Sequence, residues 1–401
     1  MNYLAGNTNS PIPIPLHYPS NIISGDGPYV VDKNGDRYID LWMGYGTLLF
    51  GHADSDIVVS VQNNIKNGWF FSYQTYLEKE LSELIHNIIP SAEKVRFATT
   101  GSDAVAYAIR ASRSYTGRKK VLSVMSGYHG VHEGMIPSGG VINNTELDLV
   151  PFNDVELVRK YLNEKKYACF LLEPILANSG CTPPEENYLK SIRDICDRTG
   201  TVLIFDEIVT GFRISINGAQ GFYNVIPDLS LFSKAISSGL PLSVVCGKKD
   251  VMEKFLPTGD VFFAGTFNGS PLSLVVAKTV IRKLQSTNLY IENEQLGDEF
   301  RKYITEQIRD LELPACVQGI ASMLTIAFGC NSFKRGIKLE QYDSDAYSFF
   351  IEEMAKRHVL LPPLPTETIF LSPVHKVVIG DIKAAIRQSF EDLKKNYYKY
   401  V

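Results

Sequence analysis

Two polar residues in the middle of the chain stand at the ends of two apolar runs. Asp206 follows the run at 201–205, and Lys234 follows the run at 229–233. Both runs predict buried strands, so that each strand would present one ionisable residue at its carboxyl end. A lysine amine can form a Schiff base with pyridoxal phosphate (PLP), and a carboxylate can pair with the pyridinium nitrogen of that cofactor. The pair therefore predicts an enzyme that uses covalently bound PLP.

Each residue of the pair also has a structural interpretation when it is taken alone. An acid after a strand is commonly a helix cap or an ion-pair partner, and a lysine commonly lies at the surface. The sequence around Lys234 favours a buried position, because Phe232 precedes it and Ile236 follows it. An amine in an apolar wall beside a protonated ring has a lowered pKa. Lys234 would then act as nucleophile and proton carrier, while an ionised Asp206 would keep the ring nitrogen protonated.

A turn of small residues at 99–103 comes directly before a helical pattern. The first backbone N–H groups of a helix have no partner inside the helix and lie at its positive end, which suits a phosphate group. We therefore interpret Gly101, Ser102 and Asp103 as candidate cofactor-binding residues. The alternative is ordinary helix capping by Ser102 or Asp103. A second polar turn, which contains Thr266, could complete the phosphate site.

Tyr128 and His129 lie between two glycines, just after the apolar run at 120–124. An aromatic ring there could lie on a planar cofactor, because the carboxyl ends of strands face the ligand crevice of an open α/β sheet. His129, His132 and Glu133 could suggest a metal site, but their order is neither H-E-x-x-H nor H-x-x-E-H. We therefore expect no metal, and a simple turn histidine is the alternative role for His129.

The elements that would position these residues follow an alternating pattern. Between about 55 and 285, helical patterns alternate with short apolar runs, which predicts an α/β fold with a mainly parallel sheet. We expect an N-terminal arm and hairpin at 1–54, a large PLP-binding domain at 55–285, and a smaller α+β domain at 286–401. The individual predictions are a hairpin at 29–40, helices at 76–89, 102–115, 154–163, 187–199, 271–286 and 379–396, and strands at 120–124, 169–172, 202–205 and 229–232.

Composition sets the broad class of the protein. The 401 residues are 45% apolar and 21% charged, as in soluble globular proteins, and the net charge of −4 indicates neither nucleic-acid nor membrane binding. The N-terminus lacks the order of a signal peptide, and the six cysteines form no C-x-x-C pair. We therefore expect a cytoplasmic enzyme that acts on small molecules. The sequence contains neither a G-x-G-x-x-G nor a Walker motif in the required context.

Together these segments resemble the class III aminotransferases of PLP fold type I, most nearly glutamate-1-semialdehyde 2,1-aminomutase. The resemblance covers nearly the whole chain and depends on the order and spacing of several motifs. It implies a large domain with a mainly parallel sheet and a smaller α+β domain built from both termini. The most specific stretches are residues 40–52, 128–130, 173–174, 206–213, 227–228, 233–234 and 265–266.

The resemblance also implies roles for individual residues. Lys234 would carry PLP, Asp206 would pair with the ring nitrogen, and Tyr128 would stack on the ring. Thr266 would reach the phosphate bound in the neighbouring subunit, which implies a homodimer with active sites at the subunit interface. The residues implied near the substrate are Tyr45, Asn178, Glu207 and Glu367.

One departure from the family bears on the substrate. The aminomutases have an arginine in the N-terminal arm that holds the substrate carboxylate, and Pro13 stands at the matching place here. Residues 1–36 contain no arginine at all. A proline cannot supply the bidentate cation that a guanidinium offers, so a different substrate is expected.

Three functional hypotheses follow. The first is an aminotransferase that moves an amino group between an amino donor and an aldehyde or ketone, such as a sugar-like or phosphorylated alcohol acceptor in a specialised or capsule pathway. The second is a 2,1-aminomutase with the same residues and a mobile lid at 137–152. The third is a non-catalytic homologue that acts as a binding protein, which would be expected to lack Lys234 or Asp206.

Overall fold

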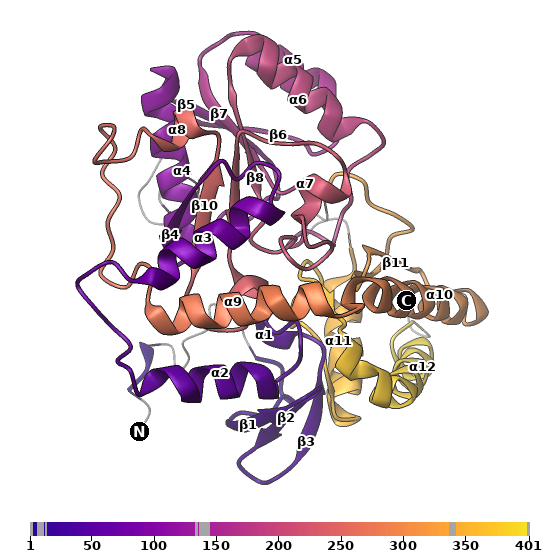
Figure 1. Ribbon diagram of the computed structural model, residues 1–401. Coiled ribbons are helices and arrows are strands. Elements are labelled where there is room, and N and C mark those ends of the chain that lie inside the picture. The colour runs from indigo at the N-terminus through magenta and orange to yellow at the C-terminus, as the bar shows by residue number, and fades with distance from the viewer. Residues whose placement is uncertain are drawn as a thin grey trace.

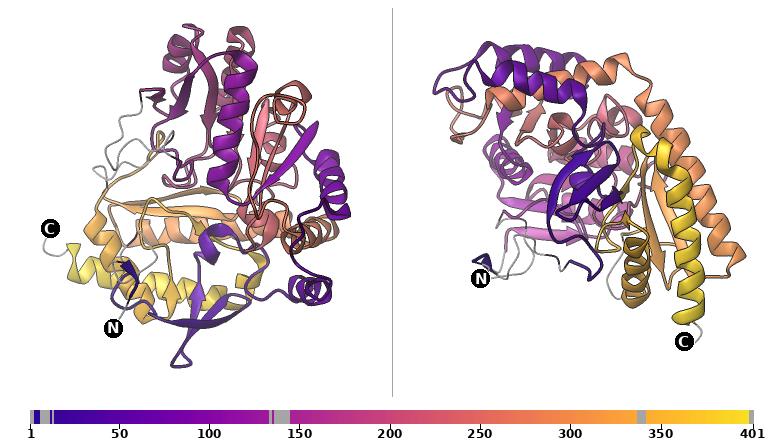
Figure 2. Two further views of the ribbon diagram at one scale, coloured as in Figure 1. Left: turned by 90° about the vertical axis from the view of Figure 1, so that its left-hand side faces the viewer. Right: turned by 90° about the horizontal axis from the view of Figure 1, so that it is seen from below.

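Figures 1 and 2 show a computed structural model of the chain. A large α/β layer lies beside a smaller part in which N-terminal strands meet the C-terminal helices. Pro13, Glu133 and the first part of the expected lid, residues 137–144, lie outside the described residues. The structure describes residues 3–5, 12, 14–132, 135, 145–336 and 342–398.

The large layer is built on a seven-stranded sheet. Strand β10 runs antiparallel to both of its neighbours, β4 and β9, and the other four pairings in the sheet are parallel. The inner strands β7, β8 and β9 are buried along their whole length, which is why their sequences are nearly continuous apolar runs. The order across the sheet is β4 (Lys94–Ala98), β10 (Ser243–Gly247), β9 (Leu229–Phe232), β8 (Val202–Asp206), β7 (Tyr167–Leu172), β5 (Lys120–Val124) and β6 (Leu147–Val150).

Helices cover both faces of this sheet because successive strand residues point to opposite sides. Leu231 packs in one apolar cluster with helix α4, whereas Phe232 packs in another with α3 and α9. Helices α5 and α6 cover the far end of the second face, against Phe170 and Leu203. The helices around the sheet are α2 (Ser55–Ile65), α3 (Tyr76–Ile88), α4 (Gly101–Thr116), α5 (Val155–Leu162), α6 (Tyr188–Thr199), α7 (Gly218–Phe222), α8 (Lys249–Met252) and α9 (Pro271–Ser286).

The predicted helices and strands of the large layer are confirmed, with ends that shift by no more than two residues. Strands β4, β6 and β10 were not predicted. Strand β4 alternates polar and apolar residues over only five positions, and β10 follows a Pro-containing turn. Their strand character depends on pairing with each other and with β9, which sequence patterns do not report.

The smaller part joins the two ends of the chain. Strands β2 (Tyr29–Asp32) and β3 (Arg37–Asp40) form the predicted hairpin, and β3 also pairs in parallel with β13 (Val359–Leu360). A second sheet packs against the C-terminal helices through a core that includes Phe328 and Phe390. The remaining elements of this part are β1 (Ile22–Asp26), β11 (Ala315–Ile320), β12 (Met323–Phe328), β14 (Ile369–Phe370), α1 (Met43–Gly46), α10 (Leu289–Asp310), α11 (Ser344–Lys356) and α12 (Ile379–Asn396).

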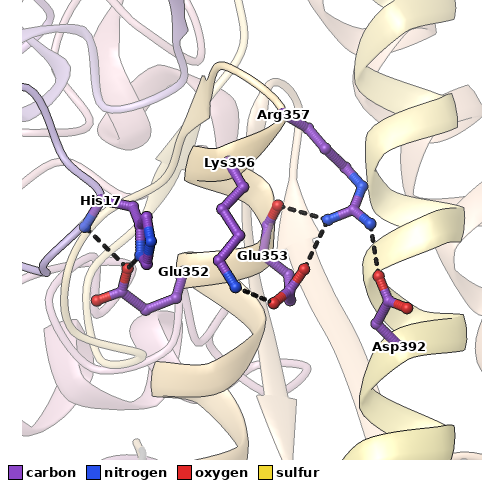
Figure 3. A network of polar contacts seen from close by, with 6 residues as sticks. All are labelled: His17, Glu352, Glu353, Lys356, Arg357 and Asp392. Carbon is purple, nitrogen blue, oxygen red and sulfur yellow. Dashed lines mark hydrogen bonds and ion pairs between the residues drawn. The ribbon is translucent and has the colours of Figure 1, made fainter.

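A polar network on α11 fastens the N-terminal arm and α12 to this part (Figure 3). The Glu352 carboxylate accepts hydrogen bonds from the backbone N–H groups of Leu16 and His17 and contacts His17 Nδ1 at 2.7 Å. Arg357 lies 2.9 Å from Glu353 and 2.5 Å from Asp392 on α12. Each charged group in this network therefore has a partner of opposite charge or a hydrogen-bond donor.

Within the described ranges, no helix is both long enough and apolar enough to cross a bilayer.

Candidate active site

The carboxyl ends of β5, β7, β8 and β9 surround a cavity of about 160 Å³. The cavity brings together six of the residues that the sequence singled out, from both the expected phosphate turn and the expected strand ends. This is the edge of an open α/β sheet where ligands bind. The lining residues are Gly101, Ser102, Tyr128, Gly130, Glu173, Asn178, Asp206, Ile208, Val209, Ser233 and Lys234.

Lys234 begins a short 3-10 helix, Lys234–Ser237, directly after β9. Its φ angle of +49° lies in the left-handed region, which is unfavourable for a residue with a Cβ. The surrounding turn holds this conformation, because Ser233 Oγ donates to the Leu242 carbonyl and Ser237 Oγ donates to the Leu240 carbonyl. Such strain is found where the surrounding structure fixes a side chain for a function.

Lys234 is partly exposed and lines the cavity, and the protein around it removes much of the water from its amine. This desolvation lowers its pKa, against the opposing effect of the nearby Glu173, Asp206 and Glu367 carboxyls. No acid among the residues described in the structure forms an ion pair with Lys234. A larger fraction of the amine is therefore neutral than at a surface lysine, and a neutral amine is the form that acts as a nucleophile.

Asp206 ends β8 and is 3% exposed. Its Oδ2 accepts a hydrogen bond from His129 Nδ1 at 2.7 Å, and its Oδ1 accepts one from the Ile208 N–H at 3.1 Å. These two hydrogen bonds, one of them from the imidazole behind it, hold the carboxylate in one orientation. The sequence placed His129 among the cofactor-binding residues, but the structure puts its ring behind Asp206 and outside the cavity lining.

The amino end of α4 supplies the expected phosphate turn. Thr100 is the N-cap, and its Oγ1 accepts a hydrogen bond from the Asp103 N–H at 3.2 Å. The Asp103 carboxylate in turn accepts one from the Thr100 N–H at 3.0 Å. Asp103, predicted as a cofactor-binding residue, thus uses its side chain to close a capping box, which was the alternative interpretation. Gly101 and Ser102 line the cavity and keep N–H groups that the helix itself cannot satisfy.

Close packing at this turn explains its small residues. A Cβ on Gly101 would lie 2.6 Å from Ile208 Cδ1. Gly130 has a φ of +82°, and a Cβ there would lie 2.2 Å from Ser102 Oγ. The Ser102 hydroxyl accepts a hydrogen bond from the Val131 N–H at 3.1 Å, so the turn that carries Tyr128 rests on the start of α4.

Glu173 is a site residue to which the sequence assigned no role. It lies after β7 and is 3% exposed, and its two oxygens accept hydrogen bonds from the Tyr128 N–H at 3.0 Å and the Ala177 N–H at 3.2 Å. One carboxyl group therefore connects the turn with Tyr128 to the loop with Asn178. Burial raises its pKa to about 7. Its position after a buried strand is the same signal that identified Asp206.

Glu367 and Tyr45 lie on segments from the smaller part. Glu367 Oε2 is buried without a hydrogen-bond partner among the described residues. Burial raises the Glu367 pKa to about 7, while the positive charge of Lys234 acts in the opposite direction, which places the two side chains near one another. Tyr45 is 45% exposed and packs on Trp42, with ring centroids 4.3 Å apart. Neither residue lines the small cavity itself.

Glu207 and Thr266 lie away from the cavity. The Glu207 carboxylate is fully buried on the opposite side from Asp206 and accepts hydrogen bonds from the Ala219 N–H, from Gln220 and from Thr210. Glu207, which the sequence placed near the substrate, points away from the cavity because adjacent residues at a strand end point to opposite faces. Thr266 is exposed and lies outside the cavity.

These groups fit PLP. Free N–H groups at a helix start suit its phosphate, a buried carboxylate suits its ring nitrogen, and a desolvated lysine amine suits its aldehyde. Tyr128 lines the same cavity and offers a ring surface. Every group that PLP requires is therefore present on one edge of the sheet.

Comparison with known proteins gives the same assignment. The family model for class III aminotransferases matches residues 15–152 and 144–373. The glutamate-1-semialdehyde 2,1-aminomutase of Methanothrix thermoacetophila is 34% identical over 395 residues, covering 94% of this chain and 91% of that protein. The protein of the same name from Methanosphaera stadtmanae is 35% identical over 390 residues, covering 94% and 92%.

A solved structure extends the similarity to three dimensions. The omega-transaminase from Sphaerobacter thermophilus superposes with a TM-score of 0.89 at 27% identity, covering 98% of this chain and 95% of that one. The names of these three relatives mention neither a sugar-like acceptor nor a capsule pathway, so the expectation of such a substrate gains no support. The chain is therefore a PLP-dependent enzyme that belongs to the class III aminotransferase family.

Proposed function

We propose that the protein is an aminotransferase that moves an amino group from an amino donor to an aldehyde or ketone. The observation that carries this choice is the charge of the cavity wall. Among its described lining residues, Lys234 is the single cationic side chain. The site therefore offers no arginine fork for a substrate carboxylate, in agreement with Pro13 in the sequence of the arm.

Arg213 does not replace that missing arginine in the cavity wall. Its side chain is fully buried, its Nη2 donates to the Gly46 carbonyl at 2.6 Å, and its guanidinium lies 4.7 Å from the centre of the Phe370 ring. Burial lowers its pKa to about 10. We assign it a role in holding the turn with Tyr45 against β14 rather than a role at the substrate.

The residues divide the work of amino transfer as follows. When bound, PLP supplies an electron sink that stabilises negative charge on the carbon next to the transferred nitrogen. Gly101 and Ser102 would bind the phosphate through backbone N–H groups, and Asp206 would keep the ring nitrogen protonated, with His129 holding the carboxylate in place. Tyr128 would cover the ring face, which excludes water from one side.

Lys234 would hold the cofactor covalently through Nζ and, once displaced by the donor amine, move the proton at the reacting carbon. The lowered pKa suits both tasks, because a general base works best when its pKa lies near the working pH. Glu173 and Glu367 would tune this amine, since their pKa values near 7 let their charge change in the range where the enzyme works.

A second candidate is a 2,1-aminomutase, in which donor and acceptor are the same molecule. It is favoured by the two relatives of that name, which are 34% and 35% identical over 94% of this chain. The same residues would carry out both reactions. The two candidates differ in whether a second carbonyl compound is consumed.

The test is an assay of purified enzyme with and without a separate keto acid. Wild-type protein should show the absorbance of lysine-bound PLP, and borohydride should fix the cofactor to Lys234. An aminotransferase should show ping-pong kinetics with donor and acceptor. Turnover of glutamate-1-semialdehyde without any second substrate would establish the mutase instead, and a protein that never binds PLP would exclude both.

We also propose that the active form is a homodimer. The exposed turn with Thr266 carries Phe267, which is 63% exposed and lies 5.8 Å from the Phe70 ring. Neighbouring Trp69 and Phe71 are also exposed, and a patch of large apolar side chains marks a contact surface. Light scattering should give twice the mass of one chain. Thr266→Ala should weaken PLP binding without changing that mass.

A further inference from the structure

Two cysteines of the smaller part face each other. Cys316 lies on β11, and Cys330 follows the end of β12, with 3.7 Å between the two sulfur atoms. Both are partly exposed and unbonded. The other four cysteines are fully buried, and burial raises the pKa of each of their thiols. The pair is thus the reactive sulfur site of the described chain.

The backbone brings the two thiols together through Gly329. Strand β12 pairs with β11 as far as Phe328, and Gly329 then turns the chain with a φ of +74°. A Cβ on Gly329 would lie 3.0 Å from the Asp343 backbone nitrogen, and the Gly329 N–H donates to the Pro314 carbonyl at 2.6 Å. The turn therefore fixes Cys330 beside Cys316.

Cys330 begins a segment, residues 330–336, that leaves the smaller part and runs to the amino end of α5 (Figure 1). Asn153 Nδ2 donates to the Lys334 carbonyl at 2.7 Å, and Arg335 lies 3.5 Å from the Asp154 carboxylate. Gly336 packs against the large layer, where its Cβ position would lie 3.2 Å from Ser179 Cβ. The segment therefore spans the two parts and ends next to the Asn178 loop.

Strand β11 reaches the same loop from the other side. Gln318, two residues after Cys316, donates from Nε2 to the Gly180 carbonyl at 3.0 Å and to Thr182 Oγ1 at 3.1 Å. The loop that carries Asn178 is thus held both by β11 and by the 330–336 segment. A bond between the two cysteines would join these two supports.

We propose that Cys316 and Cys330 form a reversible disulfide on oxidation by a peroxide, and that this bond restrains the 330–336 segment beside the active site. One thiolate attacks a peroxide oxygen, the O–O bond breaks, and a sulfenic acid and water form. The second sulfur then attacks the first, the S–O bond breaks, and a second water leaves. Two thiols and one hydrogen peroxide thus give one disulfide and two waters.

Access and acidity agree with Cys330 as the attacking residue. Cys330 opens onto a cavity of about 500 Å³ lined by the 330–336 segment and Tyr342, which admits a small oxidant. The hydrogen bond from Cys316 lowers the Cys330 pKa and raises that of Cys316, so Cys330 holds the larger share of thiolate. The thiolate is the form that reacts with peroxide.

The experiment treats the purified, PLP-loaded protein with a small excess of hydrogen peroxide. The protein is then denatured and alkylated, and its mass is measured. Reduced protein should take up six alkyl groups, one for each of its six cysteines, and oxidised protein four. The unalkylated oxidised chain should lose about 2 Da, and dithiothreitol should restore it. A tryptic peptide pair should locate the bond at Cys316 and Cys330.

A second readout follows the segment itself. Trypsin cleaves after Lys334 and Arg335, whose side chains are 75% and 60% exposed. Oxidation should slow this cleavage about threefold or more, since cleavage requires local opening of the segment. In Cys316→Ser and in Cys330→Ser, peroxide should leave the rate unchanged. Six alkyl groups after peroxide, a sulfinic acid at Cys330, a bond between two chains, or equal slowing in the variants would overturn the proposal.

Discussion

Ionisable groups at the two edges of the central sheet differ in how many partners of opposite charge they have. At the amino edge, Asp228 lies 2.9 Å from Arg193 and 2.6 Å from Lys248 and accepts a hydrogen bond from the Leu203 N–H at 2.7 Å. At the carboxyl edge, Lys234 is desolvated without an ion-pair partner among the described residues. An ionisable group whose lost contacts with water are replaced by ion pairs and hydrogen bonds contributes to stability. A group without such replacements stays free to react.

The pKa values follow from this difference. Glu173 and Glu367 at the carboxyl edge have pKa values raised to about 7 by burial, because few charges oppose the loss of water. On α11, burial of Glu353 is outweighed by its contacts with Lys356 and Arg357, so its pKa is lowered. The same residue type thus titrates in different ranges according to its partners.

The largest expected effect comes from removing the reactive amine. Lys234→Ala should lower turnover on the order of 10⁴-fold, because both the covalent link to PLP and the proton carrier are lost. Its absorbance should lack the signal of lysine-bound PLP, while its Tm should not fall, since an amine without a partner contributes no ion pair. Steady-state kinetics, spectroscopy and calorimetry measure these three quantities.

The matched control is Lys248→Ala at the other edge. Lys248 is 52% exposed in its side chain and pairs with Asp228. Its loss should leave turnover and absorbance unchanged. If both lysine variants lost activity equally, the contrast between the two edges would be refuted.

The next effect compares two aspartates of the same sheet. Asp206→Asn should lower turnover about 10²- to 10³-fold with little change in stability, because it removes the charge that faces the ring nitrogen. Asp228→Asn should leave turnover nearly unchanged but cost about 2 kcal/mol in the free energy of unfolding, since Arg193 then keeps only its ion pair with Asp197 and Lys248 loses its partner. Steady-state kinetics and urea unfolding of both variants test this contrast. It would be contradicted if Asp228→Asn lost turnover and Asp206→Asn lost stability.

A third prediction concerns pH and the apoprotein. The Glu367 pKa rises from 4.5 in the unfolded chain to about 7 in the folded one, so the folded state binds more protons between these values. The stabilisation is complete below about pH 4.5 and is lost as the pH rises through 7. Glu367→Gln should flatten the fall in Tm between these pH values by roughly 1–2 °C.

Glu353→Gln provides the opposite sign. Because the folded pKa of Glu353 is lowered, its stabilisation is present above the unfolded value and is lost as the pH falls through the folded value. The Tm of this variant should therefore differ from wild type at neutral pH and approach it in acid. Parallel curves for the two glutamine variants would show that their environments do not differ.

The smallest effect is expected at the arm network in Figure 3. Glu352→Gln weakens the contacts to His17 and the arm at a largely solvated site. It should cost about 0.5–1 kcal/mol at low salt, and less at high salt, because exposed ion pairs are screened. Turnover should stay within about twofold of wild type. A loss of activity as large as that of Asp206→Asn would show that the arm takes part in the site.

Much of the site was predictable because it follows strand ends. Asp206, Lys234 and the turn with Gly101 and Ser102 each stand directly after a buried apolar run or before a helix, and such positions meet at one edge of a parallel sheet. Glu173 obeys the same rule, and the pattern at 169–172 could have identified it.

Side-chain direction was not predictable from the sequence. Glu207 is adjacent to Asp206 in sequence, yet it points into the interior toward Gln220. Asp103 lies in the phosphate turn, yet it bonds back to Thr100. His129 supports Asp206 from behind. A motif identifies the segment that lies at the site. The backbone direction at each residue then decides which side chain of that segment enters the cavity.

The sequence alone determined the family and the cofactor and predicted Lys234 and Asp206 as the principal groups of the site, because buried strands and helix starts leave a local pattern of residue types. Only the tertiary structure decided how those groups are charged and which cysteines meet. A pKa depends on water and on charges from distant segments, as for Lys234 beside Glu173 and Glu367. The contact of Cys316 with Cys330 likewise depends on strand pairing and on the turn at Gly329.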